Sequence, residues 1–174
     1  GIKLRGEDAV IEAPPKAKAD SPCSKFVGGP EAICILGDFN PETGEVHERV
    51  RDVSVSGFTF RGFKDKDAFV IDVFGARNAT VVGNRVLGNV PGGIAFGKSV
   101  NTTIAKNHVA EVGILVNSSS RTKIVNNVVR SVPEDHPAIE ATENHDTTIA
   151  GNDLIGNWVG MLVSDSAGTK ILSN

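Results

Sequence analysis

The chain of 174 residues has no tyrosine, one tryptophan, one methionine and two cysteines. Without tyrosine, no phenol is available as a proton donor or acceptor in a reaction. No apolar run approaches the roughly 20 residues of a membrane-spanning helix. The formal net charge is −3 and no basic cluster is present, so the electrostatic signature of nucleic-acid binding is missing. We therefore expect neither a nucleic-acid partner nor a membrane partner.

Internal repetition is the most informative feature that the sequence does have. Versions of the phrase T-x-[VI]-x-x-N end in asparagines that recur every 20 to 25 residues. A second apolar phrase lies eight residues before four of these segments, first as GIAF at 93–96. Two short β-branched runs per repeat, at a period near 22 residues, indicate a β-solenoid rather than a domain with one central core. The five segments are NATVVGN (78–84), NTTIAKN (101–107), RTKIVNN (121–127), DTTIAGN (146–152) and GTKILSN (168–174).

Alignment of the repeats predicts which columns face the interior. Period-two alternation places the column that begins at Phe69 and continues with Ile94 inside, followed two positions later by the column of Ile71 and Phe96. A third inner column begins at Val81. The asparagines predict a corner where the backbone turns through left-handed geometry and the amide bonds the next coil. We interpret them as a structural ladder rather than a ligand site: Asn84, Asn107, Asn127, Asn152 and Asn174.

Earlier coils are less regular. Elements at 2–6 and 53–57 resemble the same strand, with Gly57 at the asparagine corner, and bring the count to about seven coils. Residues 7–49 are rich in Pro and Gly and read as an irregular excursion, although 9–13 and 33–36 have strand character. We expect one domain over 1–174, with regular coils over 50–174. The chain lacks an initiator Met, so we expect a piece of a longer polypeptide whose uncapped coil ends promote self-association.

The two cysteines, Cys23 and Cys34, lie in the excursion, eleven residues apart. A disulfide between them would contribute about 3 kcal/mol in the chain-entropy model and would indicate an oxidising compartment. The alternatives are two buried free thiols or a metal pair, although no second pair of Cys or His has suitable spacing.

The repeat phrases over 50–174 resemble those of right-handed parallel β-helix proteins. This pectate-lyase-like superfamily includes pectate lyases, polygalacturonases, mannuronan epimerases and periplasmic nitrous-oxide-reductase accessory proteins. The opening GIKLRG and the later VRDVSVSGFTFRGF also resemble secreted β-helix proteins of actinobacteria. The resemblance implies an all-β, right-handed parallel β-helix with three sheets, often acting on acidic polysaccharide. It also implies a secreted or extracellular bacterial protein.

The candidate site lies where coil lengths differ, because loops beside a rigid stack build grooves. The longest insert, 128–137, ends just before Glu140, the only carboxylate in an outward row that otherwise reads Val70, Ala95, Leu115 and Leu162. A carboxylate on a partly apolar surface can have its pKa raised, as a general acid or base requires. The preceding row aligns Lys66, Pro91, Glu111, His136 and Trp158.

This row predicts a sugar-binding face. Aromatic rings stack on the C–H face of a sugar while carboxylates bond hydroxyls or move protons. The plainer interpretation is that Trp158 covers an apolar edge and His136 ends a solvated loop. A second outward row, Asp72, Gly97, Asn117, Thr142 and Ser164, offers hydrogen bonds, as any soluble solenoid does. The candidates are His136, Glu140 and Glu111 for catalysis, and Trp158, Lys66, Asp135 and Asn117 for substrate binding.

The leading hypothesis is a secreted β-helix domain that binds, and in one version processes, a polysaccharide as a lyase, hydrolase or epimerase. The missing tyrosine and the missing Asp pairs depart from characterised uronate enzymes. We expect no metal site and no cofactor, and no Asp cluster supports calcium. The rival hypothesis is a non-catalytic assembly module that docks protein through its sheet faces or open coil ends.

Overall fold

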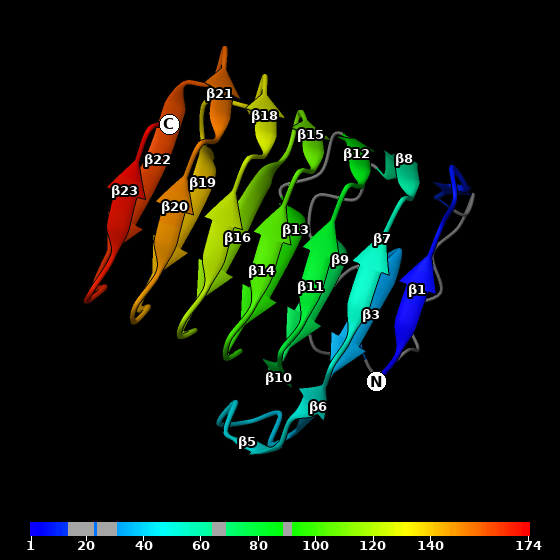
Figure 1. The fold of residues 1–174 in the computed structure, drawn as a ribbon, viewed down its shortest axis with the longest axis vertical. Coiled ribbons are helices and arrows are strands. Elements are labelled where there is room, and N and C mark those ends of the chain that lie inside the picture. The colour runs from blue at the N-terminus through cyan, green and yellow to red at the C-terminus, as the bar shows by residue number, and fades with distance from the viewer. Residues whose placement is uncertain (14–22, 24–30, 64–68, 89–91) are drawn as a thin grey trace.

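The computed structural model describes residues 1–13, 23, 31–63, 69–88 and 92–174. They form a parallel β-solenoid in which three sheets run along the stack (Figure 1). Sheet A contains seven strands: β1 (Lys3–Arg5), β7 (Ser54–Ser56), β11 (Thr80–Val82), β14 (Thr103–Ala105), β17 (Lys123–Val125), β20 (Thr148–Ala150) and β23 (Lys170–Leu172). The predicted all-β parallel solenoid is confirmed.

Sheets B and C contain six strands each. Sheet B consists of β2 (Val10–Glu12), β8 (Thr59–Phe63), β12 (Arg85–Gly88), β15 (His108–Ala110), β18 (Val128–Arg130) and β21 (Asp153–Ile155). Sheet C consists of β3 (Ile33–Leu36), β9 (Phe69–Phe74), β13 (Gly92–Gly97), β16 (Gly113–Asn117), β19 (Pro137–Thr142) and β22 (Val159–Ser164). Five regular turns, β7 to β22, take one strand from each sheet in the order A, B, C. The predicted count of seven was too high, because the excursion interrupts the first coil and β23 only begins another.

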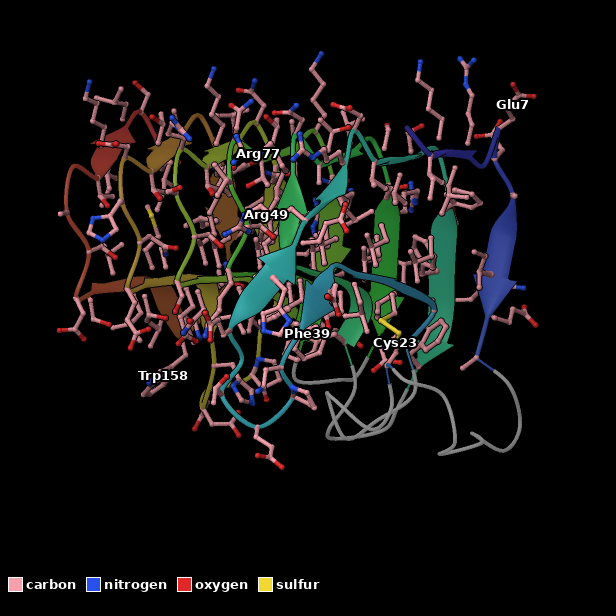
Figure 2. The ribbon with its side chains drawn as sticks, turned by 90° about the horizontal axis from the view of Figure 1, so that it is seen from below. Glu7, Cys23, Phe39, Arg49, Arg77 and Trp158 are labelled. Atoms are coloured by element: carbon pink, nitrogen blue, oxygen red, sulfur yellow. A yellow bond between two sulfur atoms is a disulfide. The ribbon has the colours of Figure 1, made fainter. Side chains whose placement is uncertain are left out.

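The excursion therefore contributes to the coil at both of its ends. Strand β2 pairs with β8, and β3 pairs with β9, as the strand character of 9–13 and 33–36 predicted. After β3 the chain forms an antiparallel hairpin of β4 (Asp38–Phe39) and β5 (Val46–Glu48), and then β6 (Val50–Arg51), which pairs with β10 (Ala76–Arg77). The ring of Phe39 packs on the ring of Phe74, with centroids 4.9 Å apart, and so anchors the hairpin beside sheet C (Figure 2).

Stacked apolar columns form the core. The inner column of sheet A stacks like residues on like residues, and five of its members are at most 1% exposed: Val55, Val81, Ile104, Ile124 and Ile149. Burial of each such side chain stabilises the fold by about 1.5–3 kcal/mol. Because every coil repeats the same alternation, the inner face is specified along the whole stack.

One predicted column was out of register in sheet C. The sequence alignment placed Phe69 beside Ile94, but the structure pairs Ile71 with Ile94 and Val73 with Phe96. The shift is two residues, so Ile71 and Val73 take the inner positions. Phe69, which was predicted to face inward, lines the outer face instead, and Val70, which was predicted to face outward, is buried in the core. The outward rows do change: Asp72 lies beside Ala95, in the position predicted for Val70. Repeat phrases could not reveal this shift, because β9 lacks the Gly-Ile phrase that fixes the alignment of later coils.

The asparagine ladder runs through the corner between sheets A and B. Each amide oxygen accepts hydrogen bonds from the backbone N–H and the amide of the preceding asparagine, as Asn107 does from Asn84 at 3.0 and 3.1 Å. The left-handed residue is not the asparagine but the one before it: Gly83, Lys106, Asn126, Gly151 and Ser173 have φ between 50° and 65°. Gly57 belongs to this left-handed column, and Asn84 caps the N–H of Phe58.

A second polar ladder, absent from the sequence predictions, follows sheet C. Side-chain oxygens of Ser99, Ser119, Asn144 and Ser166 each accept a hydrogen bond from a backbone N–H of the preceding coil. Both ladders supply hydrogen-bond partners to buried backbone N–H groups at the ends of strands. Without these partners the buried groups would destabilise the fold.

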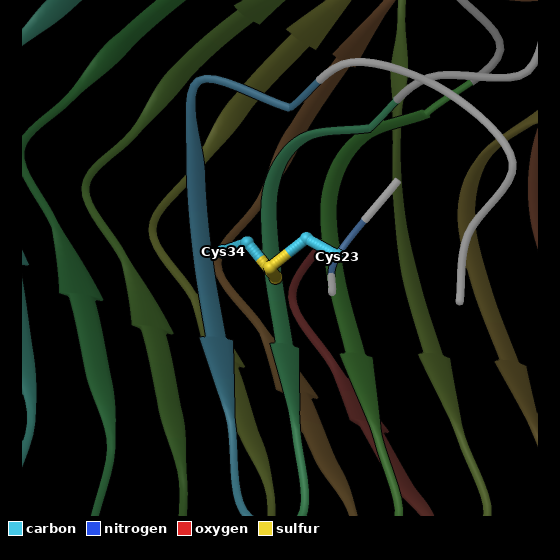
Figure 3. The surroundings of a disulfide bond; sticks show 2 residues. All are labelled: Cys23 and Cys34. Atoms are coloured by element: carbon cyan, nitrogen blue, oxygen red, sulfur yellow. A yellow bond between two sulfur atoms is a disulfide. The ribbon is translucent and has the colours of Figure 1, made fainter. Parts of the chain in front are cut away.

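The predicted disulfide is confirmed: Cys23 is bonded to Cys34, with Cα atoms 6.2 Å apart (Figure 3). The bond ties residue 23 to strand β3. Within the part of the chain that the structure describes, no helix has the length and apolarity needed to cross a bilayer.

Candidate functional site

The outer face of sheet C carries two hollows that share lining residues. One hollow of about 220 Å³ contains His136, Pro137 and Glu140, and another of about 310 Å³ contains Asp72, Phe74 and Asn117. Both are also lined by Phe69 and Leu115, so they join into one groove that crosses the coils. We call it the sheet C groove.

The floor of the groove is a register row. Ala95 and Leu115 are paired neighbours in the middle, Asp72 extends the row on one side, and Glu140 extends it on the other. The full row reads Cys34, Asp72, Ala95, Leu115, Glu140 and Leu162. The small side chain of Ala95 is only 4% exposed, which keeps the middle of the floor low.

Two phenyl rings border the groove, and glycines make room for them. A Cβ on Gly92 would lie 1.8 Å from Cδ1 of Phe69, and one on Gly97 would lie 2.6 Å from Cδ2 of Phe74. The rings therefore occupy space that any larger residue at these two positions would fill. The contact between Phe74 and Phe39 holds the second ring from its other side. Both aromatic residues are fixed by the backbone rather than free on the surface.

Asp72 is the most perturbed acid of the groove. Asp72 is only 6% exposed. Burial, and after it the charge of Glu31, raises the pKa of Asp72 to about 7, although a hydrogen bond from the backbone N–H of Val73 lowers it. Burial also raises the pKa of Glu31, whose Oε1 is buried without a hydrogen-bond partner. The two carboxyls thus hold a proton at a pH where an exposed aspartate is ionised.

Sequence reasoning missed Asp72 as an acid because of the register shift. It was assigned to the hydrogen-bonding row with Gly97, where Phe74 actually lies. The claim that Glu140 is the only carboxylate of its row is therefore wrong. An available signal was Cys34: once strand β3 is aligned with β9, Cys34 pairs with Asp72 and fixes the register.

His136 and Glu140 lie together in the other half of the groove, as the insert predicted. Glu140 is in the outer row of β19, and His136 immediately precedes that strand, where its backbone N–H donates to the carbonyl of Pro133 at 3.1 Å. Nε2 of His136 lies 3.6 Å from Oδ2 of Asp135. A partly exposed imidazole and a carboxylate therefore border the same hollow, with Asp135 oriented toward the imidazole.

The remaining predicted residues are dispersed. Asn117 lines the groove, and its amide donates to Oγ1 of Thr142 at 2.9 Å. Glu111 is exposed at a left-handed corner with φ of 64°, and its N–H bonds the carbonyl of Arg130, so it stacks beside Ser131 rather than His136. Trp158 precedes β22 as His136 precedes the paired strand β19, so the two lie on neighbouring coils as predicted, but Trp158 is 72% exposed, points away from the coil and is not among the groove residues (Figure 2). Lys66 lies outside the described residues.

The separation of the two groove carboxylates limits their chemistry. Asp72 and Glu140 are three strands apart in one row, which at about 4.8 Å per strand places their Cα atoms about 14 Å apart. Paired carboxyls that cleave one glycosidic bond lie about 5–9.5 Å apart. Asp72 and Glu140 are therefore positioned for different parts of a bound chain.

Comparison with known families identifies the chain. A family model described as "Periplasmic copper-binding protein (NosD)" matches residues 43–174. The chain belongs to the NosD family. No protein with a curated description matches it. A solved structure described as "Glycoside hydrolase" aligns with 76% of this chain at 14% identity and a TM-score of 0.36, and the aligned part is 28% of that protein.

The name of the NosD family raises the question of copper. Copper prefers thiolate, thioether and imidazole ligands, but both cysteines are in the disulfide and the single methionine, Met161, packs against the core. Among the described residues, no three His, Cys, Asp or Glu side chains gather as a metal site. The four histidines lie on separate parts of the coil: His47, His108, His136 and His145. The donors of the described residues do not fit copper.

The location of the protein follows from two agreeing observations. A disulfide persists in oxidising compartments, and the NosD family is described as periplasmic. Both indicate a periplasmic or extracellular location.

Proposed function

We propose that the sheet C groove binds a polysaccharide chain that runs across the coils. The observation that carries this proposal is the groove itself, with two phenyl rings held over Gly92 and Gly97 and polar groups at both ends. A polymer of like units matches a surface that repeats at a fixed spacing. The rings of Phe69 and Phe74 offer flat apolar faces for the C–H side of sugar rings.

The polar groups of the groove have separate tasks. Asn117 and Thr142 offer an amide and a hydroxyl to sugar hydroxyls at one end. With a pKa of about 7, Asp72 is protonated in mildly acidic solution and there donates a hydrogen bond that an ionised aspartate lacks. In that form it presents no charge to repel an acidic sugar, which favours a uronate-containing polymer.

Processing of the bound chain, in this proposal, falls to His136 and Glu140. They share one hollow, whereas Asp72 is about 14 Å from Glu140 and Glu111 lies outside the groove-lining residues. An imidazole beside a carboxylate supplies one base and one acid for proton transfer at one sugar. This pair suits elimination or epimerisation better than two-carboxylate hydrolysis.

Binding is tested with a panel of acidic and neutral polysaccharides. Leu115→Arg places a long charged side chain on the groove floor and should abolish binding. Val125→Arg on sheet A is the matched control. Both residues are half-buried, and their strands, β16 and β17, follow each other in the chain but belong to different sheets. Equal loss of binding in both variants, with unchanged melting, would contradict the groove.

Processing is tested separately, by recording unsaturated products, reducing ends and changes in uronate configuration with and without calcium. His136→Ala and Glu140→Gln should each abolish turnover and preserve binding. Binding without any product would limit the proposal to a carbohydrate-binding domain.

A second candidate function is an assembly module that docks protein. The exposed apolar side chains of Trp158, just before β22, and of Val159 and Leu162 on that strand favour it, with 72%, 36% and 44% of their surfaces exposed. Under this alternative Trp158→Ala alters association, whereas Leu115→Arg does not.

A further inference from the structure

The outer face of sheet B carries two arginines and a histidine on three adjacent strands. Arg85 on β12 is the register partner of His108 on β15. Arg130 on β18 lies one row further along, opposite Ala110. Neighbouring strands are about 4.8 Å apart, so the arginine side chains, one on each flanking strand, are long enough to reach the imidazole.

The electrostatics of His108 agree with this register placement. Burial lowers the pKa of His108, and the charges of Arg130 and then Arg85 lower it further. The surrounding positions hold one uncharged register partner and two exposed carboxylates. The other register partner of His108 is the uncharged Val128, Asp153 is exposed one strand beyond it, and Glu111 is exposed at the corner after β15.

The arginines also lack the partners that a structural role would supply. On the same face Arg61 donates to Glu12, but Arg85, His108 and Arg130 take part in none of the ion pairs found among the described residues. The Nε of Arg130 is buried and has no hydrogen-bond partner. Arg85 and Arg130 lie two strands apart with His108 between them, and the buried unsatisfied donor of Arg130 destabilises the fold. An anion held between the two arginines would offset this cost.

We propose that Arg85 and Arg130 bind an oxyanion group above His108. A guanidinium matches carboxylate, sulfate and phosphate through paired N–H donors, and the Nε of Arg130 is one such donor without a partner. The site lies on a different sheet from the proposed polysaccharide groove and does not depend on it. Free inorganic ions and the acidic groups of a polymer share this chemistry.

Anion binding can be measured through the pKa of the imidazole of His108. In NMR titrations of the intact protein, the pKa of His108 should rise when phosphate, sulfate or oligogalacturonate is added at constant ionic strength, because a bound anion stabilises the imidazolium. Chloride is the control salt, and His145, which lies in a separate column of the coil, is the internal reference. Arg85→Gln and Arg130→Gln should each raise the pKa of His108 before any anion is added and weaken anion binding tenfold or more.

The anions separate the two sources. A response to phosphate and sulfate as well as to the oligosaccharide supports a general oxyanion site, and a response to oligogalacturonate alone supports a site for carboxylated polymer. Equal shifts at His108 and His145 would mean screening only and would overturn the proposal. So would unchanged binding in both arginine variants, with Lys123→Gln on sheet A as the matched loss of one cation.

Discussion

Replacement of Asn127 by alanine is the most direct test of how the coils are held together. Asn127 is fully buried in the middle of the ladder. Its Oδ1 accepts from the backbone N–H and the amide of Asn107, both at 3.0 Å. Its Nδ2 donates to the carbonyl of Ile104 at 3.0 Å and to Oδ1 of Asn152 at 3.0 Å. Alanine removes all four of these bonds at once.

The magnitude follows from which partners are left without a bond. The amide of Asn107 retains the carbonyl of Val81, and Oδ1 of Asn152 retains the backbone N–H of residue 127. The N–H of Asn107 is left without a bond, whereas the carbonyl of Ile104 keeps its place in the β14–β17 pairing and loses only its second bond. One buried group without a bond costs about 1–3 kcal/mol, so Asn127→Ala should lower the free energy of unfolding by about that much.

Urea denaturation followed by circular dichroism measures this effect. Asn126→Gly is the matched control, because Asn126 is the adjacent exposed amide and its φ of 55° suits glycine. We expect the control to change stability by less than about 0.5 kcal/mol. Both transitions must have equal m values, since solenoids can unfold in parts. A loss below about 1 kcal/mol for Asn127→Ala would refute the ladder as the main tie at this corner.

Three further predictions concern the groove and its surroundings. Gly92→Ala should displace the ring of Phe69 and weaken polysaccharide binding at least tenfold, as measured by calorimetry. Unchanged affinity would show that binding does not need the ring. Reduction of the Cys23–Cys34 bond should lower the free energy of unfolding by about 3 kcal/mol in urea titrations, and Cys23→Ser should reproduce the loss and become insensitive to reductant. The pKa of Asp72 is near 7 in the folded protein and 3.8 in the unfolded chain, so the folded state binds an extra proton between these values and stability from this group is lost as pH rises toward 7. Asp72→Asn should remove that fall, with higher stability than the parent at pH 8 and little difference at pH 4; identical pH profiles would show that Asp72 does not hold the proton.

Much of the fold was predictable because the determinants are local and repeated. The alternation around Ile104, Ile124 and Ile149 specifies an inner face without knowledge of distant contacts. The ladder was predictable for the same reason, although its left-handed residue was placed one position too late. Asparagine tolerates left-handed geometry, so the sequence pattern alone does not distinguish Asn126 from Asn127. The hydrogen bonds do, because only Asn127 reaches the neighbouring coil.

The candidate site was less predictable because it depends on absolute register. His136 and Glu140 are near each other in sequence and follow an insert, so their shared hollow could be expected. Asp72 required the alignment of β3, β9 and β13, strands that are separated by the excursion and by irregular connections. A two-residue shift preserves the alternation and is invisible to any argument from periodicity.

The same regularity explains where function can lie on this molecule. Positions that follow the repeat are occupied by the core columns and the ladders, so chemistry is confined to residues that depart from it. Phe69, Phe74 and Asp72 are such departures in the first regular coil, and His136 and Glu140 are departures in the fourth. Rigid spacing then fixes the distance between the two groups at three strands from Asp72 to Glu140. Because a solenoid does not bend one coil against another to bring them together, a ligand that uses both ends of the groove must itself be long, and this favours a polymer over a small molecule.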